Sequence, residues 1–387
     1  MKFFHTADWH LGKLVQGVYM TNDQRIVLQQ FLEAIDIEKP DAVIIAGDLY
    51  DRAVPPTEAV HLLDEMFAEI VLKRKTPLLT IAGNHDSPGR LNFGSKLMKE
   101  TGLHIVGQLS RNMQTIILND TYGEVHFHLV PYADPSQVRY QLEEETIITH
   151  NQAMKKIIES IEETMDKTKR HVFIGHAFVT PHGQEEENTS DSERPLAIGG
   201  AEYVDANLFE PFHYTALGHL HQAHYVLNET IRYSGSPLKY SISEEHHKKG
   251  FLIVEIDGKG KTTVEKRLLE PTRDMRTVEG FLQDILKQTV SEDYVFVKLL
   301  DDTPILSPME QIRTVYPNAM HVERKSFQLM GLSKEQEVGR TKKDEFTLFR
   351  SFYTEVSGKE ASEETEQIFK EVLTLLAQEE REGGKIN

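Results

Sequence analysis

The sequence predicts an α/β protein in which central β-sheet layers are flanked by helices. Three apolar runs in its first quarter, at 2–7, 41–47 and 77–83, have the length and composition of short, largely buried strands. Two segments with helical periodicity separate them, Gln24–Ile37 and a stretch that opens on a Pro-Pro pair and runs from Pro55 to about Lys75. Strand and helix therefore alternate, which is the pattern of helices packed on a central sheet.

Later segments continue the β pattern and extend the first domain to about residue 270. A polar, acidic stretch from Pro181 to Gly200 interrupts them, and it is long enough to be functional or mobile rather than a simple connector. The expected strands are Glu124–Pro131, His171–His176, Tyr214–Leu217, Ile231–Tyr233, Phe251–Ile256 and Thr262–Leu268.

The character of the chain changes near residue 271, where a second domain is expected. Glu279–Lys287 and Met309–Val315 have helical character, and Tyr294–Leu299 reads as an extended segment between them. This is room for a small α+β capping domain over residues 271–330.

The last segment, 331–387, is expected to be a linker followed by a helical hairpin. Leu332–Lys343 is polar and linker-like, and Ser362 is placed to cap the second helix. Both helices carry apolar residues at helical spacing, which is unusual for a solvated tail. They are Phe346, Phe349, Phe352 and Tyr353 in the first helix, and Ile368, Phe369, Val372, Leu373, Leu375 and Leu376 in the second.

Composition excludes several classes of protein. The 387 residues include 43 Lys and Arg against 61 Asp and Glu, a net charge of -18, so binding to nucleic acid would need a local basic patch, a metal ion or a partner. The chain has no cysteine, which excludes disulfides, thiolate nucleophiles and Cys-ligated metal sites, and leaves His, Asp, Asn and Glu as metal ligands. No secretory signal or apolar run of about 18 residues is present, so we expect a cytoplasmic protein without a membrane partner.

Ligand-type side chains recur just beyond the apolar runs, where an α/β sheet places its active site. A spacing of two residues in extended chain puts both members of a pair on one side, so each such pair can face one metal centre. Glycines 47, 83, 175 and 218 precede four of the clusters, and we interpret them as sharp turns that expose the following side chains. The clusters are Asp8 and His10; Asp48; Asn84, His85 and Asp86; His176; and His219 and His221.

Each of these residues alone would more often be a structural histidine, a helix cap or a turn residue. Five clusters at five strand ends are rarely produced by capping alone, so the joint pattern favours a metal centre. Seven nitrogen or oxygen ligands are enough for two cations when one carboxylate bridges them, an arrangement that hydrolyses phosphoesters. With imidazole and carboxylate ligands, manganese, iron and zinc are all compatible.

The ordered set D-x-H, GDxxD, GNHD, GH and GHxH resembles the calcineurin-like metallophosphoesterase superfamily. Within it, ADWHLGK, GDLYDRAVPP, GNHDSPGRLNF, SDSERPLAIGG and YSGSPLKYS resemble the SbcD family, the bacterial nuclease subunits of SbcCD complexes. The superfamily motifs span Asp8–His221 and the SbcD-like runs reach about Ser243. The C-terminal third is similar mainly in layout.

The resemblance implies roles for these residues. Asp8, His10, Asp48 and His221 would surround one metal, and Asp48, Asn84, His176 and His219 the other, with Asp48 as the bridge. His85 would face the scissile phosphate and stabilise or protonate the leaving oxygen, with Asp86 or Asp51 holding its ring. Archaeal and eukaryotic relatives carry a second catalytic histidine where this chain has Asp51, so the second acid-base role is open here.

The resemblance also implies a substrate and partners. Such proteins are usually manganese-dependent exonucleases on double-stranded DNA ends and endonucleases on hairpins or single strands, acting in DNA repair, recombination and replication. They work as homodimers within a heterotetramer that contains an SbcC-like ATPase. Lys13, Arg52, Arg90 and Lys96 are candidate contacts to DNA phosphates because they lie close in sequence to the metal motifs, although each alone is more often a solvated charge.

Two other functions compete with a DNA nuclease. A small-molecule or phosphoprotein phosphoesterase would use the same metal core but would need only about the first 260 residues. A non-catalytic adaptor that keeps the fold for binding is disfavoured, because every expected ligand position is occupied.

Overall fold

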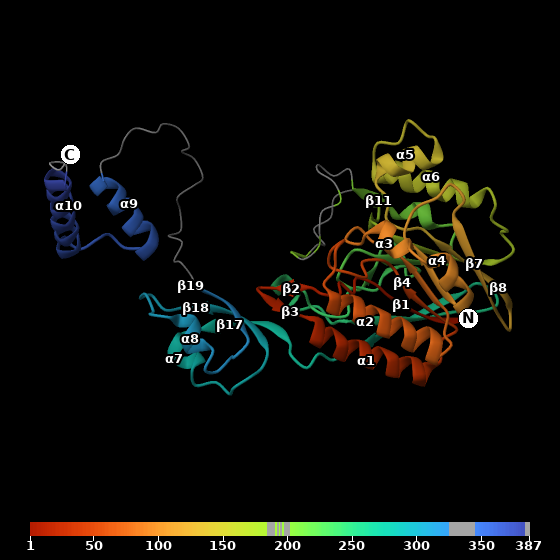
Figure 1. The fold of residues 1–387 in the computed structure, drawn as a ribbon, viewed down its shortest axis with the longest axis horizontal. Helices are drawn as coiled ribbons and strands as arrows, with labels where there is room; N and C mark the ends of the chain where they lie inside the picture. Colours follow the sequence, from red (N-terminus) through yellow and green to blue (C-terminus); the bar gives the residue numbers. More distant parts are fainter. Residues whose placement is uncertain (184–189, 192, 194–195, 197–201, 325–344, 384–387) are drawn as a thin grey trace. The chain divides into compact units, whose positions relative to one another are not determined.

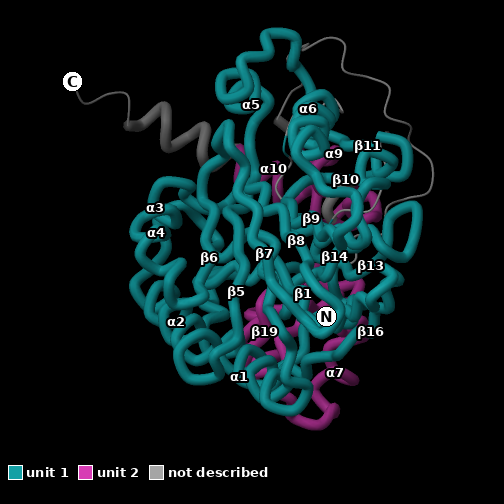
Figure 2. The backbone as a smooth tube through the Cα atoms, turned by 90° about the vertical axis from the view of Figure 1, so that its right-hand side faces the viewer, with its two compact units in different colours: residues 1–276 teal, residues 277–387 magenta. Residues whose placement is uncertain are grey.

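The structure is a computed structural model that describes residues 1–183, 190–191, 193, 196, 202–324 and 345–383. It contains two compact units, residues 1–276 and 277–387 (Figure 2). The expected linker at 332–343, and most of the acidic stretch from Pro181 to Gly200, lie outside the described residues. In the described ranges, no helix has both the length and the apolar character needed to cross a membrane.

The first unit contains two six-stranded mixed sheets. Each sheet has four neighbouring parallel strands. Antiparallel pairing extends the sheet on one side of these strands in the first sheet and on both sides in the second. The first, in spatial order, is β16 (Thr262–Leu268), β15 (Gly250–Ile256), β1 (Lys2–Thr6), β4 (Ala42–Ile45), β5 (Leu78–Ile81) and β6 (Leu103–Val106). The second is β13 (His224–Tyr225), β14 (Ile231–Tyr233), β12 (Tyr214–Gly218), β9 (Arg170–His176), β8 (Gly123–Leu129) and β7 (Gln114–Asp120). Two short pairs complete the strands, β2 (Leu14–Val15) with β3 (Val18–Tyr19) and β10 (Phe178–Thr180) with β11 (Tyr203–Asp205).

The two sheets pack face to face around a shared apolar core. Phe3 of β1 lies edge-on to Phe127 of β8 and to Tyr214 of β12, with ring centroids 5.6 and 5.7 Å apart. The outer face of the first sheet packs against α1 (Thr21–Glu38) and α2 (Thr57–Phe67), as Figure 1 shows. The outer face of the second packs against α5 (Pro135–Leu142) and α6 (His150–Glu162). The predicted fold class, β-sheet layers flanked by helices, is confirmed.

Most expected elements of the first unit are present with small shifts of their ends. The second expected helix is α2 continued by a π-helical turn over Ala68–Lys73. Helix α6 was not expected from the sequence, although a capping box marks its start: Thr149 Oγ1 accepts from the Gln152 N–H at 3.2 Å, and Gln152 Oε1 accepts from the Thr149 N–H at 3.1 Å. The short helical elements are α3 (Pro88–Asn92), α4 (Ser95–Met98), η2 (Lys99–Thr101), η3 (Ala206–Phe209) and η4 (Ile242–Glu244).

The second unit contains a three-stranded sheet in the order β17 (Met275–Gly280), β18 (Tyr294–Leu299) and β19 (Ala319–Arg324), with helices α7 (Leu282–Ile285) and α8 (Pro308–Ile312). The expected strand Tyr294–Leu299 coincides with β18. The helix expected over Glu279–Lys287 was wrong at its start, because its first residues complete β17 and only α7 is helical. Apolar residues of β17, β18 and both helices form one small core.

The hairpin helices are α9 (Glu345–Ser357) and α10 (Glu363–Gly383). Ser362 caps α10, since its hydroxyl accepts the Thr365 N–H at 3.2 Å. Phe349 of α9 stacks on Phe369 of α10 with ring centroids 3.9 Å apart, which joins the two helices. Apolar side chains also remain outside this contact: Phe352, Ile368 and Val372 are 65%, 58% and 46% exposed.

Candidate metal centre

The candidate ligands meet at the carboxyl ends of parallel strands from both sheets. Asp8, Asp48 and Asn84 follow β1, β4 and β5 of the first sheet, and His176 and His219 lie at the ends of β9 and β12 of the second. Three groups place their ligand atoms within 4.8 Å of one another. The groups are Asp8, His10 and His221; Asp8, Asp48 and His176; and His10, Asp51 and His85.

Asp48 occupies the middle of this arrangement. Its Oδ2 lies 3.6 Å from His10 Nε2 and 3.4 Å from His176 Nε2, so the carboxylate stands between the two imidazoles. Its other oxygen accepts the His85 N–H at 2.8 Å. Asp8 belongs to two of the three groups, so its carboxylate lies close to ligand atoms of both.

The remaining expected ligands lie at the edge of this cluster. Asn84 Oδ1 is 2.8 Å from His176 Nε2. The His219 N–H donates to Asp8 Oδ1 at 3.0 Å, and its ring centroid is 5.5 Å from that of His176. Among the described residues, the three groups above include neither Asn84, an amide, nor His219.

Four candidate ligands have left-handed backbone conformations. The φ angles of Asp8, His10, Asp48 and His219 are 54°, 43°, 50° and 109°. Such conformations each cost on the order of 1–3 kcal/mol and persist where surrounding contacts fix them, typically at functional sites. Main-chain hydrogen bonds do so here: the Asp8 N–H donates to Gly47 O at 3.1 Å and the His10 N–H to Asp48 O at 3.0 Å.

The glycines before the ligands act differently from the expectation. Of the four, only Gly47 has a positive φ, 91°. A Cβ on Gly83 would lie 2.2 Å from Asp48 Oδ1, and one on Gly218 would lie 1.9 Å from the carbonyl oxygen of Ala46. At these two positions the reason for glycine is close approach of neighbouring chain, not a sharp turn.

Hydrogen bonds fix the orientation of two imidazoles. Nδ1 of His176 donates to the carbonyl of Ala46 at 2.9 Å, and Nδ1 of His221 donates to Glu244 Oε1 at 3.0 Å. Each ring therefore turns its Nε2 lone pair toward the centre, as metal-binding histidines do. The Nε2 atoms of His10 and His221 lie 3.1 Å apart, and His176 Nε2 faces two oxygens. Lone pairs this close repel unless a proton or a cation lies between them, so the donor set fits a metal ion.

The charges of the cluster support the same conclusion. Burial lowers the pKa of His176 by itself, but the Asp48 carboxylate outweighs this and raises the pKa to about 9, so a proton takes the place of a cation. Burial raises the pKa of Asp8 to about 7. Burial also places the pKa of His10 and of His219 well below the ordinary value, which leaves both rings neutral and able to bind metal.

A main-chain carbonyl helps to orient His85. Its Nδ1 lies 2.7 Å from the carbonyl oxygen of Asp51, and its ligand atom and a carboxylate oxygen of Asp51 lie within 4.8 Å of each other. The Asp86 carboxylate instead accepts the N–H groups of Leu49, Tyr50 and Gly83 at 3.0–3.1 Å. Asp86 therefore ties the loop after β4 to the loop after β5.

Two of the candidate basic residues lie at Asp51. Lys13 Nζ is 2.8 Å from Asp51 Oδ1, and Arg52 Nη2 is 3.7 Å from Asp51 Oδ2. The Asp51 carboxylate therefore holds both basic side chains close to the cluster. Arg90 and Lys96 are exposed on α3 and α4, and neither belongs to the three ligand groups.

The residues that support the ligands were not expected from the sequence. Glu244 and Lys249 are both buried, and Lys249 Nζ lies 2.5 Å from Glu244 Oε2. Lys249 Nζ also donates to the carbonyl of His221 at 2.8 Å. Glu193 Oε1 accepts the His221 N–H at 2.5 Å. On the opposite side, the Gln24 amide donates to the carbonyl of His10 at 2.8 Å. These residues follow no apolar strand and no glycine, so the pattern of ligands at strand ends gives no signal for them.

The chain is similar to known proteins along nearly its whole length. A family model described as calcineurin-like phosphoesterase matches residues 1–223, and one described as Type 5 capsule protein repressor C-terminal domain matches residues 271–357. A protein of Staphylococcus saprophyticus subsp. saprophyticus, named as the D subunit of the nuclease SbcCD, is 34% identical over 383 residues, 98% of this chain and 99% of that relative. A protein of the same name from Staphylococcus epidermidis is 34% identical over 387 residues, 99% of this chain and 100% of that relative. A solved dimetal phosphatase from Danio rerio is 11% identical, with a TM-score of 0.39, over 69% of this chain and 96% of that one.

Proposed function

The chain belongs to the calcineurin-like phosphoesterase family and, along nearly its whole length, to the SbcD family of SbcCD nuclease subunits; on this premise we propose that it is a metal-dependent DNA nuclease. The observation that carries the proposal is the buried cluster of two carboxylates and facing imidazoles around Asp48. The reaction is hydrolysis of phosphodiester bonds within an SbcCD-type complex in DNA repair and recombination.

Two divalent ions, most consistent with manganese, would be held by the expected sets. Asp8, His10, Asp48 and His221 would bind one, and Asp48, Asn84, His176 and His219 the other. When bound, such a pair activates a water molecule and stabilises the attacking and leaving oxygens of an in-line displacement. Asp48 would be the bridge, which agrees with its place between His10 and His176.

His85 would act on the leaving oxygen. Its main-chain N–H is bonded to Asp48 and its Nδ1 is bonded to the Asp51 carbonyl, and Nε2 would carry the proton given to the leaving oxygen. Its ring lies edge-on to that of His10, with centroids 4.6 Å apart. Asp51, which stands where some relatives carry a second histidine, would position Lys13 for a DNA phosphate.

The test is cleavage of labelled DNA by the purified chain with manganese. We expect cutting of double-stranded ends and of hairpins that is lost when metal is removed by a chelator, and little turnover of a phosphate monoester. Asp48→Ala should lose both ions and nearly all cleavage, because its carboxylate contacts both ligand sets. Turnover of the monoester but not of DNA would favour the small-molecule or phosphoprotein phosphoesterase. Two bound ions in Asp48→Ala would refute the bridge.

We further propose that residues 1–270 are the nuclease domain, 271–330 a capping domain, and 331–387 the linker and hairpin that bind an SbcC-like ATPase. The exposed Phe352, Ile368 and Val372 support a helix-in-groove contact with another chain. Truncation after Gly331 should preserve metal-dependent cutting and abolish association with the ATPase.

A point-variant version of this experiment avoids removing whole helices. Replacing Phe352, Ile368 and Val372 together by serine should weaken binding to the ATPase, whereas the exposed Glu364→Ser on α10 should not. Unchanged co-purification of the triple variant, or a large loss of thermal stability on truncation, would contradict the assignment of the hairpin.

A homodimer, within a heterotetramer with the ATPase, is the proposed assembly. An apolar surface groove of about 500 Å³ lies between α2 and the α3–α4 segment, and Phe93 and Leu97 at this segment are 83% and 81% exposed. Exposed apolar patches of this kind mark protein interfaces. Sedimentation should show a dimer that Phe93→Asp with Leu97→Asp converts to a monomer; a monomeric wild-type chain would contradict this assembly.

A further inference from the structure

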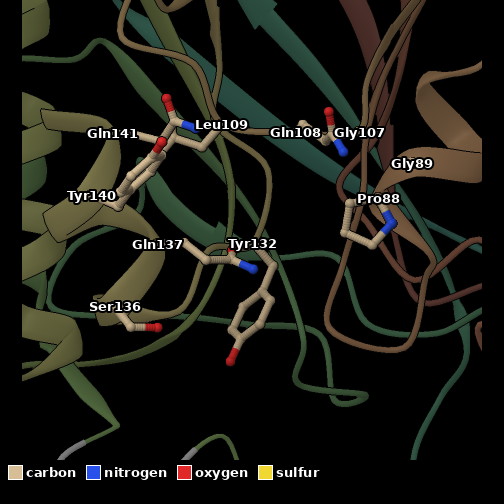
Figure 3. Close-up of a pocket in the computed structure, with 10 residues that line it drawn as sticks. All are labelled: Pro88, Gly89, Gly107, Gln108, Leu109, Tyr132, Ser136, Gln137, Tyr140 and Gln141. Carbon is tan, nitrogen blue, oxygen red and sulfur yellow. The ribbon is translucent and has the colours of Figure 1, made fainter.

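A second cavity, of about 530 Å³, has Tyr132, whose ring contacts the candidate ligand His176, in its lining, which is drawn in Figure 3. Its walls come from three segments: the start of α3 at Pro88, the chain after β6 at Gln108, and α5 with the Tyr132 that precedes it. Figure 3 shows Gln137 and Tyr140 of α5 on one side of the cavity and Pro88 on the other. The volume is in the range of small-ligand sites, about 300–1,000 Å³.

Tyr132 connects this cavity to the metal centre. Its N–H donates to the carbonyl of Ala82 at 2.9 Å, two residues before Asn84, and its ring lies edge-on to that of His176, with centroids 6.5 Å apart. Pro88, on the opposite wall, is three residues after His85. Both walls of the cavity are therefore connected to residues of the centre, the wall at Tyr132 through a ring contact and the wall at Pro88 through the chain.

The lining has the chemistry of a site for a neutral, planar, hydrogen-bonding ligand. None of the 10 lining residues is charged, which argues against a phosphate or carboxylate as the occupant. Tyr140, which is 82% exposed, supplies an aromatic face, on which nucleobases of any sequence stack. Tyr132 supplies a second aromatic ring, which also stacks on His150 with centroids 5.9 Å apart. Gln108, Gln137 and Gln141 supply amides, each with donors and an acceptor, and within the described part of the chain none of these amides is hydrogen-bonded.

We propose that this cavity is a subsite for one unpaired nucleobase of the DNA strand, next to the phosphate that is cut. The inference rests on the proposed nuclease function and deepens it. Unpaired nucleotides at frayed ends and in hairpin loops can enter such a pocket at the lowest cost, because little pairing and stacking has to be broken. Stacking on tyrosine and hydrogen bonds from the glutamine amides would hold the displaced base and position the adjoining phosphate at the cluster.

The test uses the full chain, manganese, and a hairpin oligonucleotide whose cut phosphate has been mapped. In two further hairpins, each nucleotide that flanks this phosphate is replaced in turn by an abasic residue. Tyr140→Leu on α5 and Tyr132→Leu remove the aromatic faces. Tyr122→Leu, in the exposed turn between β7 and β8 and outside the cavity, is the matched control.

For the intact hairpin, we expect either cavity variant to raise KM by roughly 5- to 150-fold, the effect of one lost base-stacking contact. One of the two abasic hairpins should raise the KM of the wild-type chain by a similar factor, and on that hairpin variant and wild type should be equal. Tyr122→Leu should match the wild type on all three. Metal content is measured for Tyr132→Leu, because the Tyr132 ring contacts the candidate ligand His176. If Tyr132→Leu loses metal, Tyr140→Leu decides the case, because in the described structure the Tyr140 ring makes no contact with a candidate ligand.

Two results would overturn the subsite alone. One is a wild-type chain that cuts DNA and whose KM is unchanged by either abasic position. The other is a KM that the cavity variants raise by the same factor on intact and abasic hairpins. A wild-type chain that cuts no DNA with manganese would overturn the nuclease function and the subsite together. The two failures are therefore distinguishable.

Discussion

Glu244→Gln is the perturbation that best separates the support of the metal centre from the centre itself. Glu244 is buried, and its carboxylate binds His221 Nδ1 at 3.0 Å through one oxygen and Lys249 Nζ at 2.5 Å through the other. Glutamine has almost the same shape but no charge. The variant should therefore leave a buried ammonium without its counter-ion and a histidine without its carboxylate.

The two losses have different sizes and different readouts. Removing one partner of a buried ion pair costs about 3–5 kcal/mol, so the free energy of unfolding measured with urea should fall by that amount. Losing the outer carboxylate of a metal-binding histidine typically costs about 10- to 100-fold in metal affinity, which titration calorimetry with manganese measures. Glu265→Gln, in an exposed position on β16, should change neither quantity and serves as the control.

A double variant tests the cause of each effect. Glu244→Gln with Lys249→Met removes both charges, so most of the lost stability should return, while the metal affinity should stay low because His221 still lacks its carboxylate. Wild-type stability of Glu244→Gln would refute the account of the ion pair. Wild-type metal affinity of Glu244→Gln would refute the role of Glu244 in orienting His221.

Two further predictions concern the leaving group and the dependence of stability on pH. His85→Gln should keep bound metal and DNA affinity while cleavage falls by roughly 10²- to 10⁴-fold, the usual loss for a general acid; loss of metal together with activity would contradict that role. Arg170 forms two hydrogen bonds with Asp120, at 2.6 and 2.8 Å, and holds the pKa of Asp120 well below its ordinary value, so the folded state stabilises the carboxylate. The stability gained from this ion pair is present above the ordinary pKa of about 4 and is lost as the pH falls below that value. Asp120→Asn should therefore lower the free energy of unfolding by about 3–5 kcal/mol at pH 7 and by progressively less below pH 4, as measured by urea unfolding. A difference that does not vary with pH would contradict it.

That the candidate ligands lie close together was predictable because their positions depend on local sequence and on one general property of sheets. Asp8, Asp48 and Asn84 each follow a short apolar run, and parallel strands bring their carboxyl ends to one edge. The same rule holds for His176 and His219 in the second sheet, where β9 and β12 are parallel. Spacing along the chain was therefore enough to group residues that are more than 200 positions apart.

The supporting residues were not predictable because their partners are set by packing. Glu244 lies 23 residues after His221, in a short helical turn, and Gln24 reaches the carbonyl of His10 from α1. Nothing in the sequence around either residue distinguishes it from a surface helix residue. Gly83 and Gly218 were misinterpreted for the same reason: what a Cβ at either position would meet is known only once neighbouring strands are in place.

The errors in secondary structure have separate causes. The start of α6 carries a recognisable cap at Thr149 and Gln152, so this helix was within reach of sequence reasoning. The helix expected over Glu279–Lys287 failed because tertiary pairing with β18 took the residues up to Gly280 into a strand. Local preference for a helix is weak in so short a segment and is easily overridden.

The centre depends on how the two sheets dock, because each sheet supplies part of it. The His219 N–H, after β12, donates to the Asp8 carboxylate, after β1. Within the same two strands, His5 of β1 contacts β12 through both ring nitrogens: Nδ1 lies 2.9 Å from the Tyr214 hydroxyl, and Nε2 lies 3.2 Å from the Leu217 carbonyl oxygen. Burial lowers the pKa of His5 to about 3, so the ring stays neutral. Polar contacts thus fix the register of the sheets beside the ligands. A cation that bound Asp48, after β4, and His219 would join the same two sheets, so metal binding and the docking of the sandwich should stabilise each other.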